Sequence, residues 1–185
     1  ERSANLEAIS HLSKGLEILS ALPENSDRDR LELAFQTAIG GPLIATYGYA
    51  APQMGAAYSR AHVLCDQLGD NSALLATLSG EFIYHFVRGD YSTMENLTEE
   101  ARCAAERTQD EPLALAAHRL CALTAMHAGA FLRASSEFET ILSEYDPARH
   151  RPPPIHYVHD PKVSALAYLA PVLWILGYPE QAGRF

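Results

Sequence analysis

FIYHFVRGDYSTMENLTEEA, residues 82–101, reads as a helix, a turn at Gly89-Asp90-Tyr91, and a second helix. Three further glycine–aromatic turns divide the chain in the same way, at Gly48-Tyr49, Gly129-Ala130-Phe131 and Gly177-Tyr178. The glycines of successive turns lie 41, 40 and 48 residues apart (48 to 89, 89 to 129, 129 to 177). A spacing near 40 residues predicts a helical-repeat solenoid, in which each helix hairpin buries its apolar face against the next hairpin.

Apolar residues recur every three or four positions in each segment between the turns, as they do in amphipathic helices. No stretch alternates polar and apolar residues over the length of a strand, so the predicted fold class is all-α. We expect helices at 5–22, from the cap at 25–27 to Tyr47, and at 52–68, 72–88, 91–108, 111–128, 130–144, 161–176 and from 179 onward.

Two proline-containing segments modify this pattern. Gly40-Gly41-Pro42 lies inside the second helix, where proline lacks the N–H that would bond to the Ala38 carbonyl and so predicts a kink. The two glycines could instead admit a closely packed neighbouring helix. Residues 146–160, DPARHRPPPIHYVHD, contain three consecutive prolines and account for the longer last interval. We expect 146–160 to be an irregular insertion in a single repeat domain spanning 1–185.

Composition restricts the classes of partner. The 185 residues carry a formal net charge of −9, which disfavours nucleic acid and anionic membranes as partners. No apolar run reaches the roughly 18 residues of a membrane span. The three cysteines, Cys65, Cys103 and Cys121, lie within helical patterns, which predicts buried reduced thiols in a cytoplasmic protein. The chain begins with Glu1 and not with Met, so we expect it to be a fragment of a longer polypeptide.

Three segments resemble a known repeat family: EAISHLSKGLEIL (7–19), GYAAPQMGAAYSRAHVLCDQLGD (48–70), and YDPARHR followed by HDPKVSALAYLAPVLWILGYPEQA (145–151 and 159–182). They look like the tetratricopeptide-like region of bacterial multidomain signalling proteins that carry a class III adenylate/guanylate cyclase domain and an AAA-type ATPase domain. The resemblance implies a tetratricopeptide-like α-α superhelix in a parent that makes a nucleotide signal or hydrolyses ATP. This chain has no Walker A motif, and we expect the fragment itself to be non-catalytic.

One cluster contains residue types that can hold a metal: His150, His156, His159 and Asp160. Its spacing matches no metal motif, and Asp160 precedes a helix as a capping residue does. We therefore assign no metal, no cofactor and no catalytic residue. His85, His118 and His127 lie within helices, and satisfied or solvent-facing side chains explain them best.

The function expected is protein interaction and regulation, with a protein or peptide segment, even one from the parent chain, as the partner. Aligning the repeats on their turn glycines places eight residues on a concave groove: Ser79, Ile83, Phe86, Arg119, Leu123, Met126, His127 and Trp174. Inter-helix core is the alternative reading of these residues. Uncapped terminal helices also predict a homodimer. A small-molecule sensor with a pocket between repeats is the alternative function.

Overall fold

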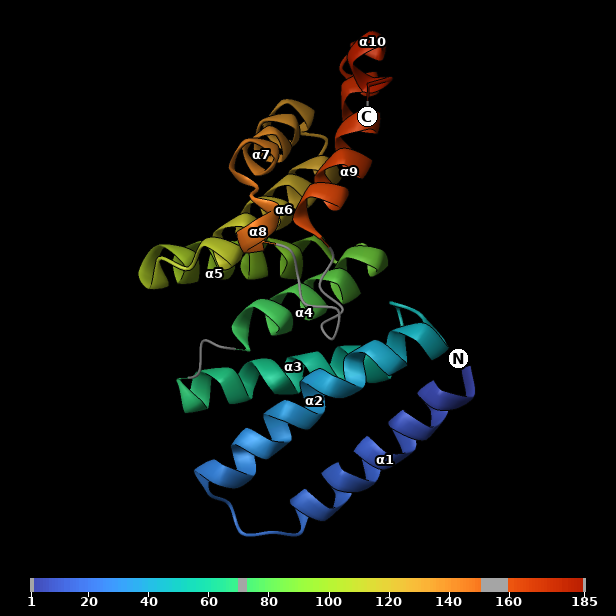
Figure 1. Cartoon of the computed structure of the whole chain (residues 1–185), viewed down its shortest axis with the longest axis vertical. Coiled ribbons are helices and arrows are strands. Elements are labelled where there is room, and N and C mark those ends of the chain that lie inside the picture. Colours follow the sequence, from blue (N-terminus) through green and yellow to red (C-terminus); the bar gives the residue numbers. More distant parts are fainter. Residues whose placement is uncertain (1, 70–72, 151–159, 185) are drawn as a thin grey trace. The chain divides into compact units, whose positions relative to one another are not determined.

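The computed structural model describes residues 2–69, 73–150 and 160–184, and within them every regular element is a helix (Figure 1). The helices are α1 (Arg2–Ser20), α2 (Ser26–Tyr47), α3 (Pro52–Leu68), α4 (Leu74–Arg88), α5 (Tyr91–Thr108), α6 (Glu111–His127), α7 (Phe131–Glu144), α8 (Pro147–His150), α9 (Pro161–Ile175) and α10 (Pro179–Ala182). None of these helices is long and apolar enough to cross a membrane.

The chain separates into two compact units, Glu1–Asp90 and Tyr91–Phe185. In unit 1, α1 packs on α2, α2 on α3 and α3 on α4. In unit 2, α5 packs on α6, α6 on α7, α7 on α9 and α9 on α10. The prediction of an all-α fold is confirmed, with sequential, antiparallel-like helix packing inside each unit. The tetratricopeptide superhelix stays a prediction.

The four glycine–aromatic turns are confirmed in detail. Gly48, Gly89, Gly129 and Gly177 have φ values of 86°, 70°, 74° and 87°, a region that L-residues rarely adopt. Each glycine lies one or two residues after the last residue of a helix. The next helix begins two residues after Gly89, Gly129 and Gly177, and four residues after Gly48. Glycine is therefore required at these turns by backbone conformation, which is why the spacing located the helices so well.

Capping side chains set other boundaries. Asn25 accepts hydrogen bonds from the N–H groups of Asp27 and Arg28 at the start of α2, and Asp110 accepts one from Leu113 in α6.

The structure corrects two helix boundaries that were expected from the sequence. The helix expected from residue 72 is observed from Leu74, with 70–72 outside the described residues. Within the segment expected to be irregular, Pro147–His150 forms one helical turn, α8, while 151–159 lie outside the described residues.

A tyrosine wedged between two glycines determines how three helices of unit 1 pack. Tyr58 on α3 is 5% exposed. A Cβ at Gly40 on α2 would lie 2.2 Å from the Tyr58 hydroxyl oxygen, and a Cβ at Gly80 on α4 would lie 2.3 Å from ring carbon Cε1. Gly40 in α2 thus admits the neighbouring helix α3, and α2 continues through Pro42 to Tyr47. Burial also raises the pKa of Tyr58 to about 12.

We expect Gly80→Ala to destabilise the protein although alanine is the better helix former. The Tyr58 ring cannot retreat from a new methyl group because Gly40 blocks its other side. The helix-propensity gain of about 1 kcal/mol is then outweighed by overpacking, for a net loss of about 1–2 kcal/mol in urea unfolding.

A double-mutant cycle checks this cause. In a Tyr58→Leu background the ring is absent, so Gly80→Ala should cost less by about 0.5 kcal/mol or more. Strictly additive effects of the two substitutions would contradict the wedge.

A partly buried ion pair joins α2 to α3 in the same unit. Arg60 donates two hydrogen bonds to the carboxylate of Glu32, at 2.6 and 2.8 Å. The hydrogen bond from Arg60 lowers the pKa of Glu32, against a smaller rise caused by burial. Because the pKa is lower in the folded state, Glu32 contributes stability above its unfolded pKa, and this contribution is lost as the pH falls through the folded pKa.

Glu32→Gln should therefore lower the free energy of unfolding by about 1 kcal/mol at pH 7. The difference from the wild type should shrink as the pH falls below about 4.5, the ordinary pKa of the carboxyl group. Glu24→Gln is the matched control, because the Glu24 side chain is 88% exposed and its carboxylate lies 3.8 Å from Arg28. A difference between Glu32→Gln and wild type that stays constant from pH 7 to pH 3 would contradict the role of the charge.

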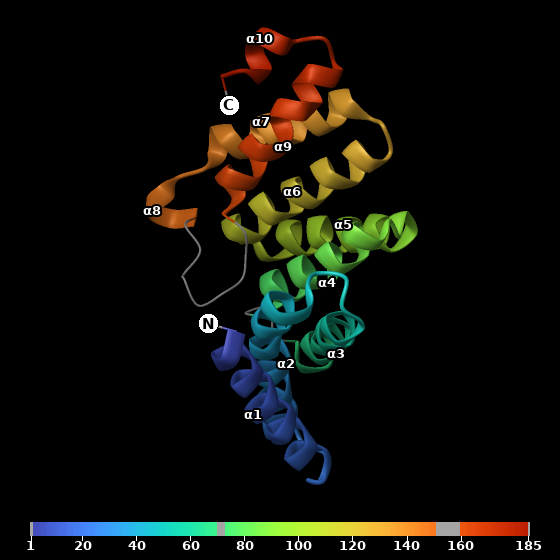
Figure 2. The same cartoon turned by 90° about the vertical axis from the view of Figure 1, so that its right-hand side faces the viewer.

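Helix α6 is the centre of unit 2, with α5, α7 and α9 all packed against it. In Figures 1 and 2 it runs beside α7 and α9 in both views. This contact on several sides explains why α6 is buried nearly all round, from Leu113 to Ala125. The other fully buried large side chains of the unit come from its neighbours: Met94, Phe138, Ile141, Leu169 and Val172.

Candidate functional site

The eight residues predicted to line a groove differ in their access to solvent. Three lie in unit 1 and five in unit 2. Ser79, Arg119 and Leu123 are buried, with 7%, 3% and 0% of their surface exposed, so they belong to the helix cores of their units. Of the remaining five, three are half-buried: Ile83, Phe86 and Met126. The other two, His127 and Trp174, are exposed.

Phe86 is partly a core residue of unit 1. Its ring stacks on that of Phe82, with centroids 6.1 Å apart, and Phe82 has no exposed surface. Trp174 differs sharply, because 67% of its surface is exposed. Of the two aromatic groove residues, Trp174 is therefore the one that a partner would reach without any rearrangement of its unit.

Arg119 is a cation inside the core of unit 2. Burial lowers its pKa to about 10, and Tyr168 opposes this only in part. The guanidinium therefore stays charged at neutral pH. The ion pairs found among the described residues do not include Arg119. A buried charge without an ionic partner has a desolvation cost that a hydrophobic residue of similar volume does not have.

Arg119→Met should accordingly preserve or raise the melting temperature, whereas Arg119→Ala should lower the free energy of unfolding by about 2–4 kcal/mol by leaving a cavity. Thermal unfolding followed by circular dichroism compares the two variants. Equal destabilisation by Met and Ala would show that the charge itself holds unit 2 together.

Histidine–carboxylate pairs join neighbouring helices in both units. His62 on α3 lies 2.7 Å from Glu81 on α4, and His118 on α6 lies 2.7 Å from Glu137 on α7. Nδ1 is the nitrogen that faces the carboxylate in each pair. The prediction that His118 is a satisfied helix residue is confirmed, and His85 likewise bonds to Asp90 at 2.9 Å.

The Glu81 carboxylate is the most buried acid of these pairs, with 7% of the residue exposed. It also accepts a short hydrogen bond from the Ser59 hydroxyl. Burial raises the pKa of Glu81, but hydrogen bonds from His62 and Ser59 outweigh this effect and lower it. Because Ser59 donates to the carboxylate and not to the imidazole, the three side chains do not form a nucleophile–base–orienter triad.

Two residues of the cluster considered as metal ligands, His150 and Asp160, make hydrogen bonds to neighbouring residues. The His150 ring accepts a hydrogen bond from the Asp146 N–H at its Nδ1, and its Nε2 lies 3.4 Å from Glu111. Asp160 caps α9 by accepting from the N–H groups of Lys162 and Val163, as predicted. The Asp160 carboxylate also accepts from the Tyr145 hydroxyl at 2.7 Å. His156 and His159 lie outside the described residues.

The cysteines depart from the prediction at one position. Cys65 and Cys121 are buried free thiols, but Cys103 on α5 is exposed. A hydrogen bond to Glu99 raises the pKa of Cys103, so less of its reactive thiolate forms at neutral pH.

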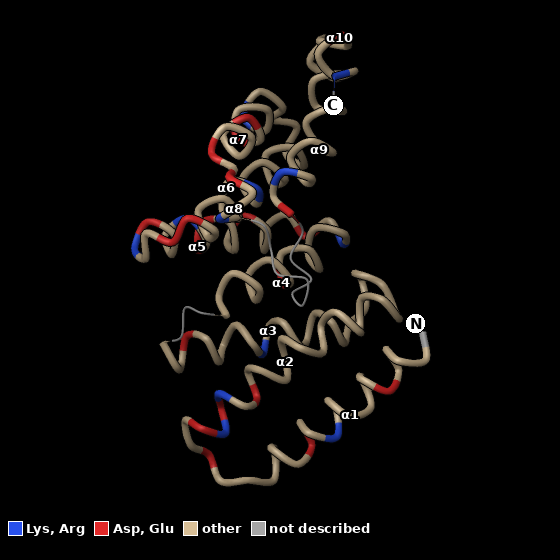
Figure 3. Tube along the Cα trace, in the orientation of Figure 1, with Lys and Arg blue, Asp and Glu red and all other residues tan. Residues whose placement is uncertain are grey.

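Helix α9 has an apolar face that its neighbours leave uncovered. After Lys162 it contains no charged residue, and Figure 3 shows it tan along this length. The exposed apolar residues fall on one side of the helix, three or four positions apart, and form what we call the outer stripe: Val163, Ala167, Pro171, Trp174 and Ile175. Val163 is 65% exposed and Ile175 is 58% exposed. A contiguous exposed apolar surface of this kind is typical of interaction sites.

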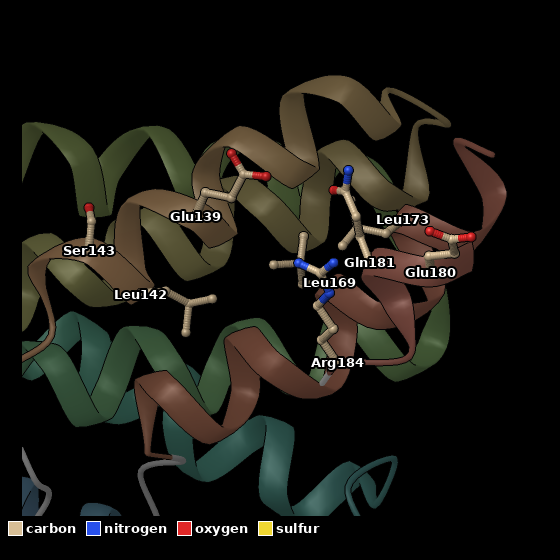
Figure 4. Close-up of a pocket in the computed structure, with 8 residues that line it drawn as sticks. All are labelled: Glu139, Leu142, Ser143, Leu169, Leu173, Glu180, Gln181 and Arg184. Atoms are coloured by element: carbon tan, nitrogen blue, oxygen red, sulfur yellow. The ribbon is translucent and has the colours of Figure 1, made fainter. Parts of the chain in front are cut away.

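A second surface feature of unit 2 is a pocket of about 530 Å³ between α7, α9 and α10. Figure 4 shows its polar side chains, which come from α7, from α10 and from Arg184 just after α10, around leucines of α9 and α7. The α9 leucines beneath it, Leu169 and Leu173, are only 1% and 4% exposed. These two leucines therefore offer little apolar surface to a peptide. Its lining is Glu139, Leu142, Ser143, Leu169, Leu173, Glu180, Gln181 and Arg184.

Comparison with known proteins identifies no relative for this chain. No family model matches it, and neither a curated protein nor a solved structure matches it significantly.

Proposed function

We propose that this chain is a non-catalytic protein-interaction module and that the outer stripe of α9 is its docking surface. The observation that supports this is the exposure of Trp174, Val163 and Ile175 on one face of a helix that lacks charge beyond its first turn. A helix that is apolar on every side is normally covered on every side. The stripe therefore suits an apolar helix or extended segment of a partner.

The expected energetics agree with such a surface. Burial of exposed apolar area contributes about 25 cal/mol per Å², and truncation of a central tryptophan in an interface commonly costs about 2 kcal/mol or more. Trp174 lies with Pro171 and Ile175 on adjacent turns, so one partner side chain could contact all three. Trp174 is the natural anchor of the surface.

We also propose that the module belongs to a larger protein. The resemblance of residues 48–70 and 159–182 to tetratricopeptide-like regions supports a cytoplasmic regulatory module of a bacterial signalling protein with a cyclase or ATPase domain. Within the parent, the occupant of the stripe would be a segment of the same polypeptide or a separate protein. A second copy of the chain is a third occupant, in which case the stripe would form the homodimer contact.

The pocket between α7, α9 and α10 supports a second candidate function, the sensing of a small molecule. Its volume of about 530 Å³ lies in the range of ligand sites. The exposed charges of Glu139, Glu180 and Arg184 at its rim favour a polar ligand. Leu142→Trp would fill the pocket and block such a ligand while leaving the outer stripe unchanged.

Trp174 provides the test of the docking surface because it is the only tryptophan in the sequence. Peptides selected from a random display library on the wild-type protein should shift the Trp174 fluorescence emission to shorter wavelength, since docking removes the indole from water. Trp174→Ala should weaken their binding by about 30-fold or more, which corresponds to about 2 kcal/mol. The melting temperature should stay within the effect of an ordinary surface substitution.

Leu132→Ala is the matched control, because Leu132 is a single apolar residue of α7 that is 73% exposed. It should leave peptide binding unchanged. Selected peptides that bind Trp174→Ala as tightly as wild type would rule out the stripe, as would a selection that yields no binder. An emission shift that depends on protein concentration alone would identify the second copy as the occupant.

A further inference from the structure

The pocket between α7, α9 and α10 carries three charged side chains that take part in no ion pair. Glu139, Glu180 and Arg184 all line the pocket and are exposed to solvent. The ion pairs of the described residues include none of the three. Glu139 accepts one hydrogen bond, from the Ser135 hydroxyl at 3.1 Å. Because a carboxylate accepts several hydrogen bonds and a guanidinium donates several, all three groups can still bind a ligand.

These charges stand on different sides of an apolar floor. Figure 4 shows Glu139 on the α7 side of the pocket and Arg184 on the α10 side. Leu169 and Leu173 of α9 lie beneath them. A ligand in the pocket therefore meets both signs of charge at its edges and hydrocarbon under its middle.

The α3–α4 hairpin of unit 1 and the α6–α7 hairpin of unit 2 are built alike. They share two sequence patterns at a spacing of 56 residues (61 to 117 and 79 to 135): Ala-His-x-Leu-Cys at 61–65 and 117–121, and Ser-x-Glu-Phe at 79–82 and 135–138. In both hairpins the histidine Nδ1 lies 2.7 Å from the glutamate carboxylate. The alanine, leucine, cysteine and phenylalanine of these patterns are buried in both. One packing scaffold thus serves both hairpins.

The pocket positions on α7 depart from this shared scaffold. At the same spacing of 56 residues, Glu139 corresponds to Ile83 and Ser143 corresponds to Val87. The hairpin of unit 1 packs with apolar residues at these two positions, so the scaffold does not require polar ones. The polar wall of the pocket is therefore a feature of unit 2 alone and suits a ligand with charged groups.

From these observations we propose that the pocket binds a basic amino acid. The proposal rests on small-molecule sensing, the second candidate function given above. Glu139 and Glu180 match the two cationic groups of such a ligand, and Arg184 matches its carboxylate through charge-assisted hydrogen bonds. The two carboxylates and one guanidinium leave the rim with a net negative charge, and the net charge of −9 on the chain attracts a cation in the same way. The aliphatic part of the ligand lies along the leucines of the floor.

Titration of the full chain with L-lysine tests the proposal. The nuclear magnetic resonance signals of Leu142 and Gln181, which line the pocket, report binding at this site. We expect saturable shifts of both signals with a dissociation constant of about 1 mM or below. Norleucine lacks the side-chain cation, 6-aminohexanoic acid lacks the α-ammonium group and cadaverine lacks the carboxylate, so each should bind more weakly than L-lysine by about threefold or more.

Substitutions in the pocket should discriminate between these probes. Glu139→Gln should weaken the binding of L-lysine and of cadaverine by about threefold to tenfold. Arg184→Gln should weaken L-lysine to a similar extent but leave cadaverine unchanged, because cadaverine has no carboxylate. Glu144→Gln is the matched control, since Glu144 is exposed on the same helix and does not line the pocket. All these side chains are exposed, so the melting temperature should stay close to that of the wild type.

Leu142→Trp separates the class of ligand from the sensing function, because it fills the pocket against any ligand. A neutral or anionic probe, such as glucose or citrate, that shifts the Gln181 signal in the wild type but not in Leu142→Trp would preserve sensing and overturn the basic amino acid as the ligand. Absence of a shift with every probe would overturn both. L-lysine binding that is unchanged in Glu139→Gln and Arg184→Gln, or norleucine binding as tight as that of L-lysine, would also overturn the proposal.

Discussion

The inner helices of each unit bury apolar residues against more than one neighbouring helix, and this constraint governs both the fold and the proposed function. A helix hairpin cannot bury such a surface alone, so successive helices must pack on one another. In unit 2 the constraint is met most completely at α6, which three helices cover. It is met least completely at α9, where one side remains exposed from Val163 to Ile175. The candidate interface is the surface of α9 on which apolar side chains remain exposed to water.

The helix order could be predicted from sequence because local chemistry determines it. Positive-φ glycines at positions 48, 89, 129 and 177 end helices for steric reasons that no distant contact alters. Asn25, Asp110 and Asp160 begin helices through side-chain hydrogen bonds that span two or three residues. The helices themselves follow the apolar periodicity between these points. Such signals lie within a few positions of one another, so a single sequence contains all of them.

The burial of the proposed groove residues could not be predicted in this way. Ser79 and Arg119 are polar, and polar residues on a helix are usually assigned to its solvent face. Arg119 is buried because α6 is covered on several sides, a fact about α5, α7 and α9 and not about the sequence around Arg119. Trp174 shows the reverse case: a large aromatic residue that composition alone would assign to a core is mostly exposed. Periodicity locates a helix face, but the number of neighbours decides which faces meet water.

The same distinction explains why the contact between His62 and Glu81 escapes sequence reasoning. A histidine on an amphipathic helix is visible in the sequence, but its position alone does not say which side chain it meets. Glu81 lies 19 residues away on another helix and contacts Nδ1 of His62 only after α3 and α4 have packed. The wedge of Tyr58 between Gly40 and Gly80 lies one turn of α3 away from His62 and sets that packing. A close contact that fixes the register of the helices therefore also determines which carboxylate this histidine meets.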